Sequence, residues 1–386
     1  MKKTIKERLG LLKEYLYLSS IISVFLILII STLVNGCVDK TAASNIQEST
    51  KIQEDIKIQE GAIKEKIKEK GLLGVFYYPW TGGNPEKSPD NQWLHWKDGK
   101  NNPPKTWASN YLPDYSSGFD PYNRLYSSKD IEIIKKQLVL MKKAGIDFVI
   151  SSWWGQNHYT DQTLDIIFNQ VLPSSGNADI KFAIYYEKEG FADTKKSDII
   201  NDINYIKNKY ARSPYYLKID GKPVIFVYNT KSGRSQETSR ENALKWKEIR
   251  DETDIYTDLK IFNGYQNIVN YADSWHEYAP ATKTGFKQVG NYSALVTPGF
   301  HKWNESPRLI REDFKRFEYN VITLKNSDVQ FKLIETWNEW GEGTGIEPAQ
   351  KINMDYINGF TPDTDSYGTK YIDILGKYFN DGENII

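Results

Sequence analysis

Two glutamates in the last fifth of the chain, Glu339 and Glu342, have the type and spacing that catalysis could use. A separation of three residues puts both side chains on one face of a helical turn, with β-carbons about 5 to 6 Å apart. Carboxyl groups about 5 to 5.5 Å apart suit retaining chemistry at a glycosidic bond. Two glutamates at this spacing are also common on a solvated helix face, so the pair alone leaves both interpretations open.

Aromatic residues strengthen the first interpretation. Trp337 and Trp340 flank the carboxylates and offer flat apolar faces beside polar groups, as sugar rings require, although tryptophan is also a frequent core residue. The apolar run Phe331 to Ile334 precedes the glycine-rich segment Asn338 to Pro348. This order predicts a buried strand that runs directly into the loop carrying the acids.

Length and composition restrict the class of protein. The 386 residues can form one large core or two ordinary ones, and the net charge is zero. A neutral chain gives no support to nucleic acid as the partner, because phosphate binding requires a basic surface. The 26 Tyr and 11 Trp favour a wide amphipathic ligand groove, although a Tyr-rich core would have the same composition. The four His show no metal-ligand spacing such as His-Glu-x-x-His, so we expect no metal and no cofactor.

The N-terminal residues 1–37 predict attachment to a membrane. Several Lys and Arg precede the apolar run Ile21 to Val34, as in an export signal or a membrane anchor. The segment Leu33 to Cys37 resembles the lipobox of prokaryotic lipoproteins, and Cys37 is the only cysteine. We expect lipidation of Cys37, with an uncleaved signal anchor as the alternative. Either way the remainder would lie outside the cytoplasm, without an internal disulfide.

The rest of the chain divides into a tether and one domain. Residues 38–70 are polar with isoleucines at loosely helical spacing, which predicts a tether that could form a helical stalk. Residues 71–386 contain no Ser/Pro-rich linker and are expected to form a single, monomeric domain.

Within this domain, strand-like runs alternate with amphipathic stretches. The predicted strands are Gly74 to Trp80, Phe148 to Trp154, Lys181 to Tyr186, Pro223 to Tyr228, Leu259 to Tyr265, Asp273 to His276, Ser293 to Thr297 and Lys332 to Trp337. The predicted helices are Ile131 to Ala144, Thr163 to Val171, Ser197 to Tyr210, Arg240 to Thr253 and Arg308 to Asn320. About eight such units predict a (β/α)₈ TIM barrel, because an open doubly wound sheet normally has fewer strands and a phosphate-binding glycine fingerprint.

Active sites of such barrels lie at the C-terminal ends of the strands. The predicted strand ends carry aromatic and polar residues, namely Tyr77, Tyr78, Trp80, Trp153, Trp154, Tyr185, Tyr186, Glu187, Tyr228, Asn229, Tyr265, Trp275, His276 and Trp337 to Glu342. Aromatic residues that only cap the barrel would explain some of these positions, but they explain the polar ones poorly.

At these residues the chain resembles glycoside hydrolase family 99, the endo-α-mannosidases and endo-α-mannanases, over roughly Gly74 to Ala349. The segments that carry the resemblance are Phe76 to Trp80, Trp93 to Trp96, Pro121 to Asp130, Ala144 to Ile146, Val149 to Trp154, Gly221 to Val224, Pro298 to Phe300 and Trp337 to Ala349. The last is the most specific, since it is similar to the family pattern Asn-Glu-Trp-His-Glu-Gly-Thr-Gln-Ile-Glu.

The resemblance implies a role for each acid. Glu342 would protonate the departing glycosidic oxygen and later activate water. Glu339 would act as base on the 2-hydroxyl of the substrate, which attacks the anomeric carbon to give a 1,2-anhydro sugar and net retention. A general acid must keep its proton near neutral pH, and an apolar wall such as Trp337 or Trp340 would raise its pKa, while its partner stays ionised.

Two departures from the family pattern affect the expected substrate. Gly341 stands where the family usually has His, and Tyr185 to Glu187 stand where it usually has His-x-Glu. Both changes concern groups expected to contact sugar hydroxyls. The two acids are retained, so hydrolase chemistry is better supported than mannose specificity.

Further residues are predicted to bind the substrate. They are Tyr78, His95, Trp96, Trp154, Glu187, Tyr265, Trp337, Asn338, Trp340 and Glu347. Glu347 precedes Pro348, so it could orient the loop instead. Arg308 and Arg311 are expected to form ion pairs. The leading hypothesis is a surface-tethered glycosidase that acts on a glycan or polysaccharide; the alternatives are a lipoprotein that binds glycan without cleaving it and a polysaccharide-assembly enzyme with a related barrel.

Overall fold

The computed structural model describes residues 40–83, 90, 94–96, 111–115, 125–174, 180–188, 194–228, 235–278, 284–302, 306–351 and 367–380. The predicted signal or anchor, with Cys37, lies outside these ranges. The chain forms two compact units, Met1–Ile58 and Gln59–Ile386, and helix α2 (Lys40–Lys70) runs across their boundary. In the ranges described, no helix combines the length and apolar character needed to cross a bilayer.

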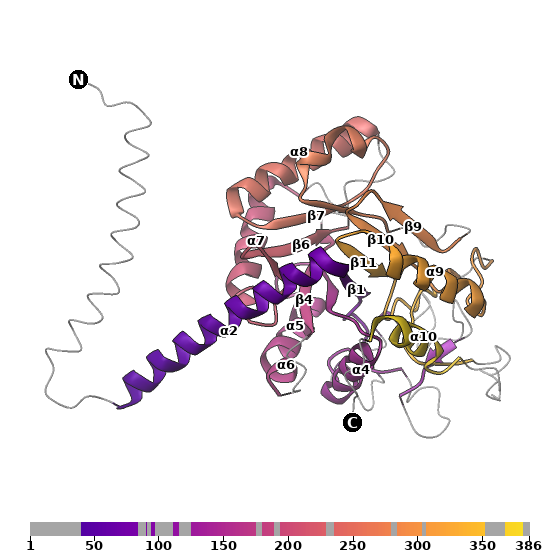
Figure 1. The fold of residues 1–386 in the computed structure, drawn as a ribbon, viewed down its shortest axis with the longest axis horizontal. Coiled ribbons are helices and arrows are strands. Elements are labelled where there is room, and N and C mark those ends of the chain that lie inside the picture. Colours follow the sequence, from indigo (N-terminus) through magenta and orange to yellow (C-terminus); the bar gives the residue numbers. More distant parts are fainter. Residues whose placement is uncertain are drawn as a thin grey trace, which may run out of the picture. The chain divides into compact units, whose positions relative to one another are not determined.

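Eight parallel strands form the barrel that the sequence predicts (Figure 1). They are β1 (Leu72–Tyr77), β3 (Phe148–Trp153), β4 (Lys181–Tyr186), β6 (Lys222–Val227), β7 (Tyr256–Lys260), β8 (Ser274–His276), β10 (Ser293–Val296) and β11 (Phe331–Ile334). Hydrogen bonds join them in the order β8-β7-β6-β4-β3-β1-β11-β10. The Ser293 hydroxyl, on β10, donates to the carbonyl oxygen of Trp275, on β8, at 2.8 Å. The two ends of this order therefore meet, and the (β/α)₈ class is confirmed.

Helices cover the outside of the barrel. The helices are α4 (Ile131–Lys143), α5 (Tyr159–Ile166), η1 (Ile167–Val171), α6 (Leu172–Ser174), α7 (Lys196–Lys209), α8 (Gln236–Thr253), η3 (Tyr265–Tyr271), α9 (Phe314–Asn326) and α10 (Lys370–Phe379). The short strands are β2 (Tyr111–Pro113), β5 (Lys218–Ile219), β9 (Phe286–Val289) and β12 (Ala349–Lys351). Among them, β5 and β9 pair with barrel strands, whereas β2 and β12 form a separate two-stranded sheet. Helix α9 begins later than predicted because Asp313 accepts a hydrogen bond from the Arg316 N–H at 3.0 Å and caps it.

Side-chain alternation along the strands separates two cores. On β11, Phe331 and Leu333 belong to the cluster inside the barrel, whereas Ile334 belongs to the outer cluster beneath the helices. The inner cluster also contains Phe76 and Phe226, whose ring centroids are 6.4 Å apart. The same alternation directs Glu335, the first residue after β11, into the barrel, where it is fully buried.

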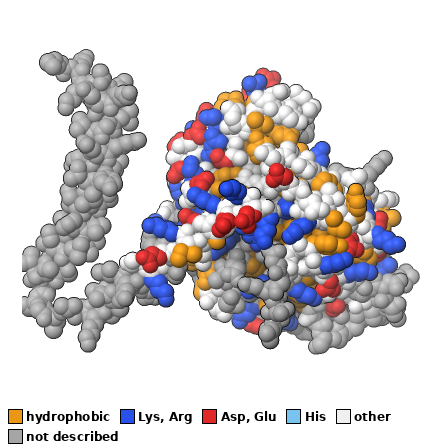
Figure 2. Space-filling model, in the orientation of Figure 1, with side chains coloured by type: hydrophobic (Ala, Val, Ile, Leu, Met, Phe, Trp, Pro, Cys, Tyr) orange, Lys and Arg blue, Asp and Glu red, His pale blue; other side chains and the backbone are white. Residues whose placement is uncertain are grey.

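The last turns of α2 belong to the barrel unit. Ile63 and Ile67 pack against the inner cluster, and Lys66 Nζ lies 2.5 Å from Asp147 Oδ1. Gly71, with φ +69°, ends the helix where an added β-carbon would meet the Val329 carbonyl at 2.3 Å. The part of residues 38–70 that follows Ile58 is thus docked on the barrel. On the described part of the face in Figure 2, acidic and basic side chains are intermixed.

Candidate active site

The segment after β11 folds back on itself at the C-terminal end of the barrel. The Thr336 N–H donates to the Thr344 carbonyl at 2.9 Å, and the Ile346 N–H donates to the Thr336 carbonyl at 2.9 Å. The Glu347 N–H donates to the Trp337 carbonyl at 3.0 Å. These bonds close residues 336–347 into a braced loop whose geometry depends on backbone contacts.

Glu339 and Glu342 lie side by side on this loop but differ in exposure. Glu339 is buried, and its Oε1 accepts hydrogen bonds from the Gly341 N–H at 2.7 Å and the Glu342 N–H at 3.3 Å. Glu342 is 28% exposed, with Oε1 3.6 Å from Lys302 Nζ. Burial and the nearby Glu342 carboxylate raise the pKa of Glu339, while the two N–H donors oppose that rise.

The top layer inside the barrel adds charged and aromatic side chains near this pair. Its members are Tyr78, Glu187, Tyr228, Lys260, Tyr278 and Glu335. Each follows the two-residue alternation of its strand beyond the residues that fill the inner core. Lys260, Tyr278 and Glu335 are not among the residues predicted from the sequence, although the two-residue alternation from the strand interiors identifies them.

The carboxyls of this layer are held in a poorly solvated region. Burial raises the pKa of Glu187 to about 8, against the opposing effects of Ser152 and Lys260. Glu335 is fully buried, and no described residue donates a hydrogen bond to either of its carboxylate oxygens. Burial, then the negative charge of Glu342, raise the pKa of Glu335 well above its usual value.

A lysine supplies positive charge among these acids. The Nζ atom of Lys260 lies 4.4 Å from the centroid of the Tyr228 ring and 5.6 Å from that of Tyr278. Burial lowers the pKa of Lys260, and the nearby glutamates, Glu335 first among them, oppose this effect. Lys260, Glu187 and Glu335 therefore form a cluster of mixed charge inside the barrel, with aromatic rings beside it.

Three predicted substrate contacts are instead buried supports of the loop. Trp337, Trp340 and Glu347 are buried, and both indole N–H groups donate to the Glu347 carboxylate, at 3.2 and 2.8 Å. Tyr115 and Gln137 also donate to Glu347 Oε1, each at 2.7 Å. Burial raises the pKa of Glu347 to about 7, while these donors oppose the rise. The prediction of sugar contact at these three residues is corrected, and the loop-orienting role of Glu347 is the one that the contacts support.

Asn338 and Trp96 are also structural. Asn338 Oδ1 accepts from the Tyr78 N–H at 2.8 Å, and its Nδ2 donates to the Tyr78 carbonyl at 3.0 Å, which fastens the loop to the end of β1. Trp96 is buried and donates from Nε1 to the Tyr126 carbonyl at 2.8 Å. Both predicted substrate contacts are corrected, because their polar groups are engaged inside the protein.

Tyr78 and His95 lie on the path from the barrel interior to the surface. The Tyr78 hydroxyl is 2.5 Å from that of Tyr278, and its ring packs on Trp80 at 4.5 Å. The Trp80 ring stacks on the exposed His95 with a centroid distance of 4.4 Å and an interplanar angle of 1°. The flat aromatic surface suits a sugar ring, so His95 stays a predicted contact.

Trp154 and Glu187 meet through a shared serine. Trp154 is partly buried, and its Nε1 donates to Ser152 Oγ at 3.0 Å. The Ser152 hydroxyl also stabilises the ionised form of Glu187. Both residues remain candidates for substrate binding, as predicted.

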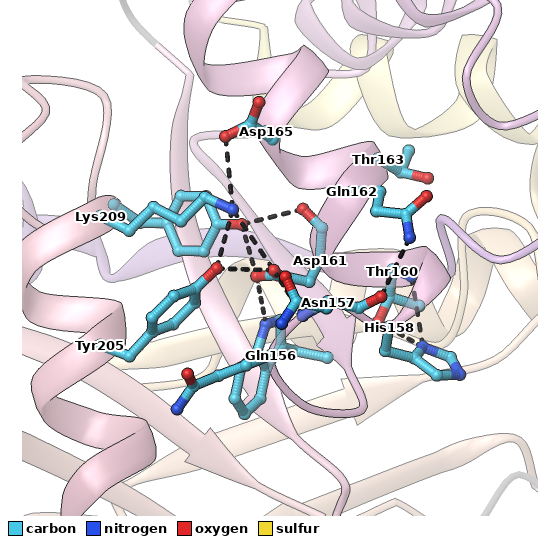
Figure 3. Close-up of polar contacts among 12 residues, drawn as sticks. Gln156, Asn157, His158, Thr160, Asp161, Gln162, Thr163, Asp165, Tyr205 and Lys209 are labelled. Atoms are coloured by element: carbon cyan, nitrogen blue, oxygen red, sulfur yellow. Dashed lines mark hydrogen bonds and ion pairs between the residues drawn. The ribbon is translucent and has the colours of Figure 1, made fainter.

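A buried aspartate fixes the strand end that presents Trp154. Asp161 accepts a hydrogen bond from Trp153 Nε1 at 2.9 Å. Figure 3 shows that it also accepts from the Tyr205 hydroxyl, at 2.7 Å, and that Lys209 Nζ lies 3.3 Å away. The neighbouring Thr160 hydroxyl accepts from the Trp154 N–H at 3.1 Å. Helix α7 and the start of α5 are thereby joined to the end of β3.

Tyr265 is not part of this constellation. It begins η3 and packs on Trp275, with ring centroids 5.2 Å apart, against the outer cluster. The substrate contact at Tyr265 stays a prediction that these contacts do not support, whereas the pKa values of Tyr78, Tyr228 and Tyr278 are raised by the site glutamates. Among the residues that the structure describes, no group of three or more His, Cys, Asp or Glu could hold a metal ion.

Paired carboxyls at the C-terminal rim of a (β/α)₈ barrel, with tyrosines and tryptophans around them, define a glycoside hydrolase site. The family model described as Glycosyl hydrolase family 99 matches residues 69–243. A second model, described as Glycosyltransferase WbsX, matches residues 234–360 and so includes the catalytic loop.

Individual proteins agree with the first model. The glycoprotein endo-α-1,2-mannosidase of Mus musculus is 22% identical over 339 residues, which cover 74% of this chain and 70% of that protein. Its counterpart in Rattus norvegicus is 22% identical over 360 residues, covering 80% and 74%. The structure of a family 99 endo-α-mannosidase from Bacteroides thetaiotaomicron has the same fold, with a TM-score of 0.61 and 22% identity over 80% of this chain and 96% of that one. The comparisons support a glycoside hydrolase that is similar to family 99 over residues 69–243 and shares the fold of a family 99 enzyme.

Proposed function

We propose that the protein is a retaining, endo-acting α-mannosidase or α-mannanase that uses the 2-hydroxyl of its own substrate. The observation that carries this proposal is the adjacency of Glu339 and Glu342 on a braced loop, one carboxyl buried and one open to the rim. The names of the relatives, endo-α-1,2-mannosidases, support an α-mannoside as the substrate class.

The proposed reaction has two steps. Glu339 takes the proton of the 2-hydroxyl, whose oxygen attacks the anomeric carbon while the glycosidic bond breaks and Glu342 protonates the departing oxygen. The ionised Glu342 then takes a proton from water, which attacks the anomeric carbon and opens the 1,2-anhydro ring. Glu339 returns its proton to O2. Two inversions leave the configuration of the product retained.

The raised pKa of Glu339 opposes the ionised form that this cycle requires. Burial favours a protonated Glu339, and Lys302 lies beside the more open Glu342. Two backbone N–H groups already bind Glu339 Oε1. A sugar hydroxyl would add a further donor, and each donor favours the ionised carboxylate. Substrate binding would thus favour the ionised Glu339 that the first step needs.

The sugar that fits need not be mannose. Gly341 has no side chain where the family usually has His, and Tyr185 is buried with its hydroxyl 3.1 Å from His276 Nε2. These departures support a related α-glycan, such as a cell-surface polysaccharide, as the alternative substrate.

We also propose that residues 1–37 attach the protein to the outer side of the membrane, through lipidated Cys37 or an uncleaved anchor. This proposal is supported by the basic, apolar and Leu33 to Cys37 segments of the sequence. Labelling with a radioactive fatty acid tests it: Cys37→Ser should abolish labelling, whereas equal labelling of both chains would exclude lipidation at Cys37.

One comparison favours a second function, sugar transfer in polysaccharide assembly. The model described as a glycosyltransferase matches residues 234–360, where both acids lie. The two functions differ in the acceptor, which is water in hydrolysis and a sugar hydroxyl in transfer.

One experiment separates these functions. The chain from Lys40 onward is incubated with a panel of α-mannans and other α-glycans, with and without an oligosaccharide acceptor, and products are analysed by mass spectrometry and NMR. Hydrolysis that first releases the α-anomer supports the main proposal. Elongated acceptor without hydrolysis would support the transferase, and tight binding without any product would support a binding protein.

A further inference from the structure

We infer that Arg311 is a positioning residue of the active site, which holds the loop behind Glu342 in place and connects it to the C-terminal helix. This role deepens the proposed function and rests on it. Arg311 was expected to form an ion pair on a helix, but the structure places it before α9, where it is buried.

The guanidinium group binds the catalytic loop at two points. Nη1 donates to the carbonyl oxygen of Gly343, the residue that follows Glu342, and Nη2 donates to the carbonyl of Gly345 at 2.5 Å. The planar fork of arginine can serve two carbonyls at once with fixed geometry, whereas the single ammonium of lysine cannot. Gly343 has φ +64°, a conformation that a bound carbonyl helps to fix.

The C-terminal segment completes this support. The Tyr367 hydroxyl lies 2.5 Å from Arg311 Nη2 and 3.3 Å from the Glu347 carbonyl oxygen. The guanidinium carbon is 5.1 Å from the Tyr367 ring centroid and 5.6 Å from that of Tyr371, whose hydroxyl donates to the Arg311 carbonyl. Residues far apart in the chain thereby converge behind the loop.

The segment that carries Arg311 also holds Glu342 from its other side. Phe300 pairs with Leu309, and the next N–H, that of His301, donates to the Glu342 carbonyl at 2.9 Å. An added β-carbon on Gly299 would lie 2.5 Å from Arg311 Cγ. The glycine therefore provides the room for the arginine side chain, which explains why Gly299 stands at this point.

The expected consequence is loss of turnover. Misplacing a catalytic group by about 1 Å can lower the rate by about 10²-fold. Arg311→Lys keeps the charge but loses the fork, so kcat should fall by about 10- to 100-fold with KM changed by less than about 3-fold. Arg308→Lys is the matched control, because Arg308 is exposed and packs on Phe300 at 5.2 Å.

Hydrogen exchange tests the positioning directly and without turnover. In Arg311→Lys, the amides of residues 338–348 should exchange faster than in the wild type, while those of β3 and β4 stay unchanged. Gly299→Ala should reproduce this pattern by displacing Arg311, and it serves if Arg311→Lys fails to fold.

The outcomes distinguish this inference from the proposed function. In one outcome the wild type cleaves glycans, and both Arg311→Lys and Gly299→Ala keep the wild-type kcat and the wild-type exchange rates in the loop. The positioning role is then wrong, while the proposed hydrolase activity stands. If the wild type cleaves no glycan, the proposed function fails. Faster exchange of the loop in the variants would still establish that Arg311 holds it, and unchanged exchange would overturn this.

Discussion

The Gly341 N–H donates a 2.7 Å hydrogen bond to Oε1 of Glu339, and a β-carbon on Gly341 would stand 2.9 Å from the same oxygen. The residue in this position therefore controls where the Glu339 carboxylate lies.

Substitution of Gly341 should disturb the proposed base more than substrate binding. Gly341→Ala pushes the Glu339 carboxylate by a few tenths of an ångström and weakens its hydrogen bond, so we expect kcat to fall about 10-fold with KM little changed. Steady-state kinetics on the cleaved glycan measures this. Gly61→Ala is the control, because no atom lies within 4 Å of its added β-carbon. Equal kcat for Gly341→Ala and the wild type would contradict the role given to this contact.

Glu347 should matter for stability. The Glu347 carboxylate only accepts hydrogen bonds, and indole, phenol and amide groups donate to it. Glu347→Gln replaces one of its oxygens with an NH₂ group, which donates and so faces other donors. We expect a loss of about 1 to 3 kcal/mol in the free energy of unfolding, measured in urea. Glu132→Gln, at an exposed residue that pairs with Lys135, should change it by less than about 0.5 kcal/mol. A variant as stable as the wild type would show that these buried donors are satisfied in another way.

The buried carboxyls of the top layer should make stability fall as pH rises. Their folded pKa values are raised, to about 8 for Glu187 and well above the usual value for Glu335. The folded state then binds more protons than the unfolded state above the unfolded pKa near 4.3, so stability is fully present below that pH and declines as pH rises toward the folded pKa values.

Thermal unfolding between pH 5 and 8 measures this decline. Glu335→Gln removes one titrating group, so its melting temperature should depend less on pH than that of the wild type. Parallel curves for the two chains would show that Glu335 does not titrate differently in the folded state.

The helix α2 should contribute to the barrel only through its last turns. Ile63→Ser with Ile67→Ser removes apolar contacts with the inner cluster, and we expect a loss of about 1 to 3 kcal/mol in unfolding free energy. Ile58→Ser, at a residue that is 70% exposed, is the control and should have little effect. If the double variant is as stable as Ile58→Ser, the last turns of α2 do not stabilise the barrel. The folded unit would then begin near residue 71, as predicted from the sequence.

The fold could be predicted from sequence because strand and helix periodicities are local. Lys181 to Tyr186 matched a strand end to end, and Ile131 to Ala144 matched a helix within one residue. Residues 308–313 do not form the predicted helix. Asp313 caps the start of α9, and Leu309 pairs with Phe300, and these two contacts override the amphipathic pattern.

The supporting contacts of the site could not be predicted in the same way. Trp337, Asn338 and Glu347 look like ligand-binding residues in sequence, but their partners come from distant segments such as Tyr78, Tyr115 and Gln137. Only the folded chain shows that these polar groups are already satisfied. Lys260 and Glu335, in contrast, were accessible to sequence reasoning, because the alternation along β7 and β11 directs them inward.

The most direct test of the central claim compares Glu342→Gln and Glu339→Gln on two substrates, a glycan and an aryl α-mannooligosaccharide whose leaving group needs no proton. Without the general acid, cleavage of the glycan should fall about 10²- to 10⁴-fold, while the first release of the aryl group, measured in a single turnover, should stay near the wild-type rate because only the later opening of the 1,2-anhydro ring needs Glu342. Without the base, both substrates should be cleaved poorly. Wild-type cleavage of the glycan by Glu342→Gln, or full activity of Glu339→Gln on the aryl substrate, would contradict the roles assigned to the two acids.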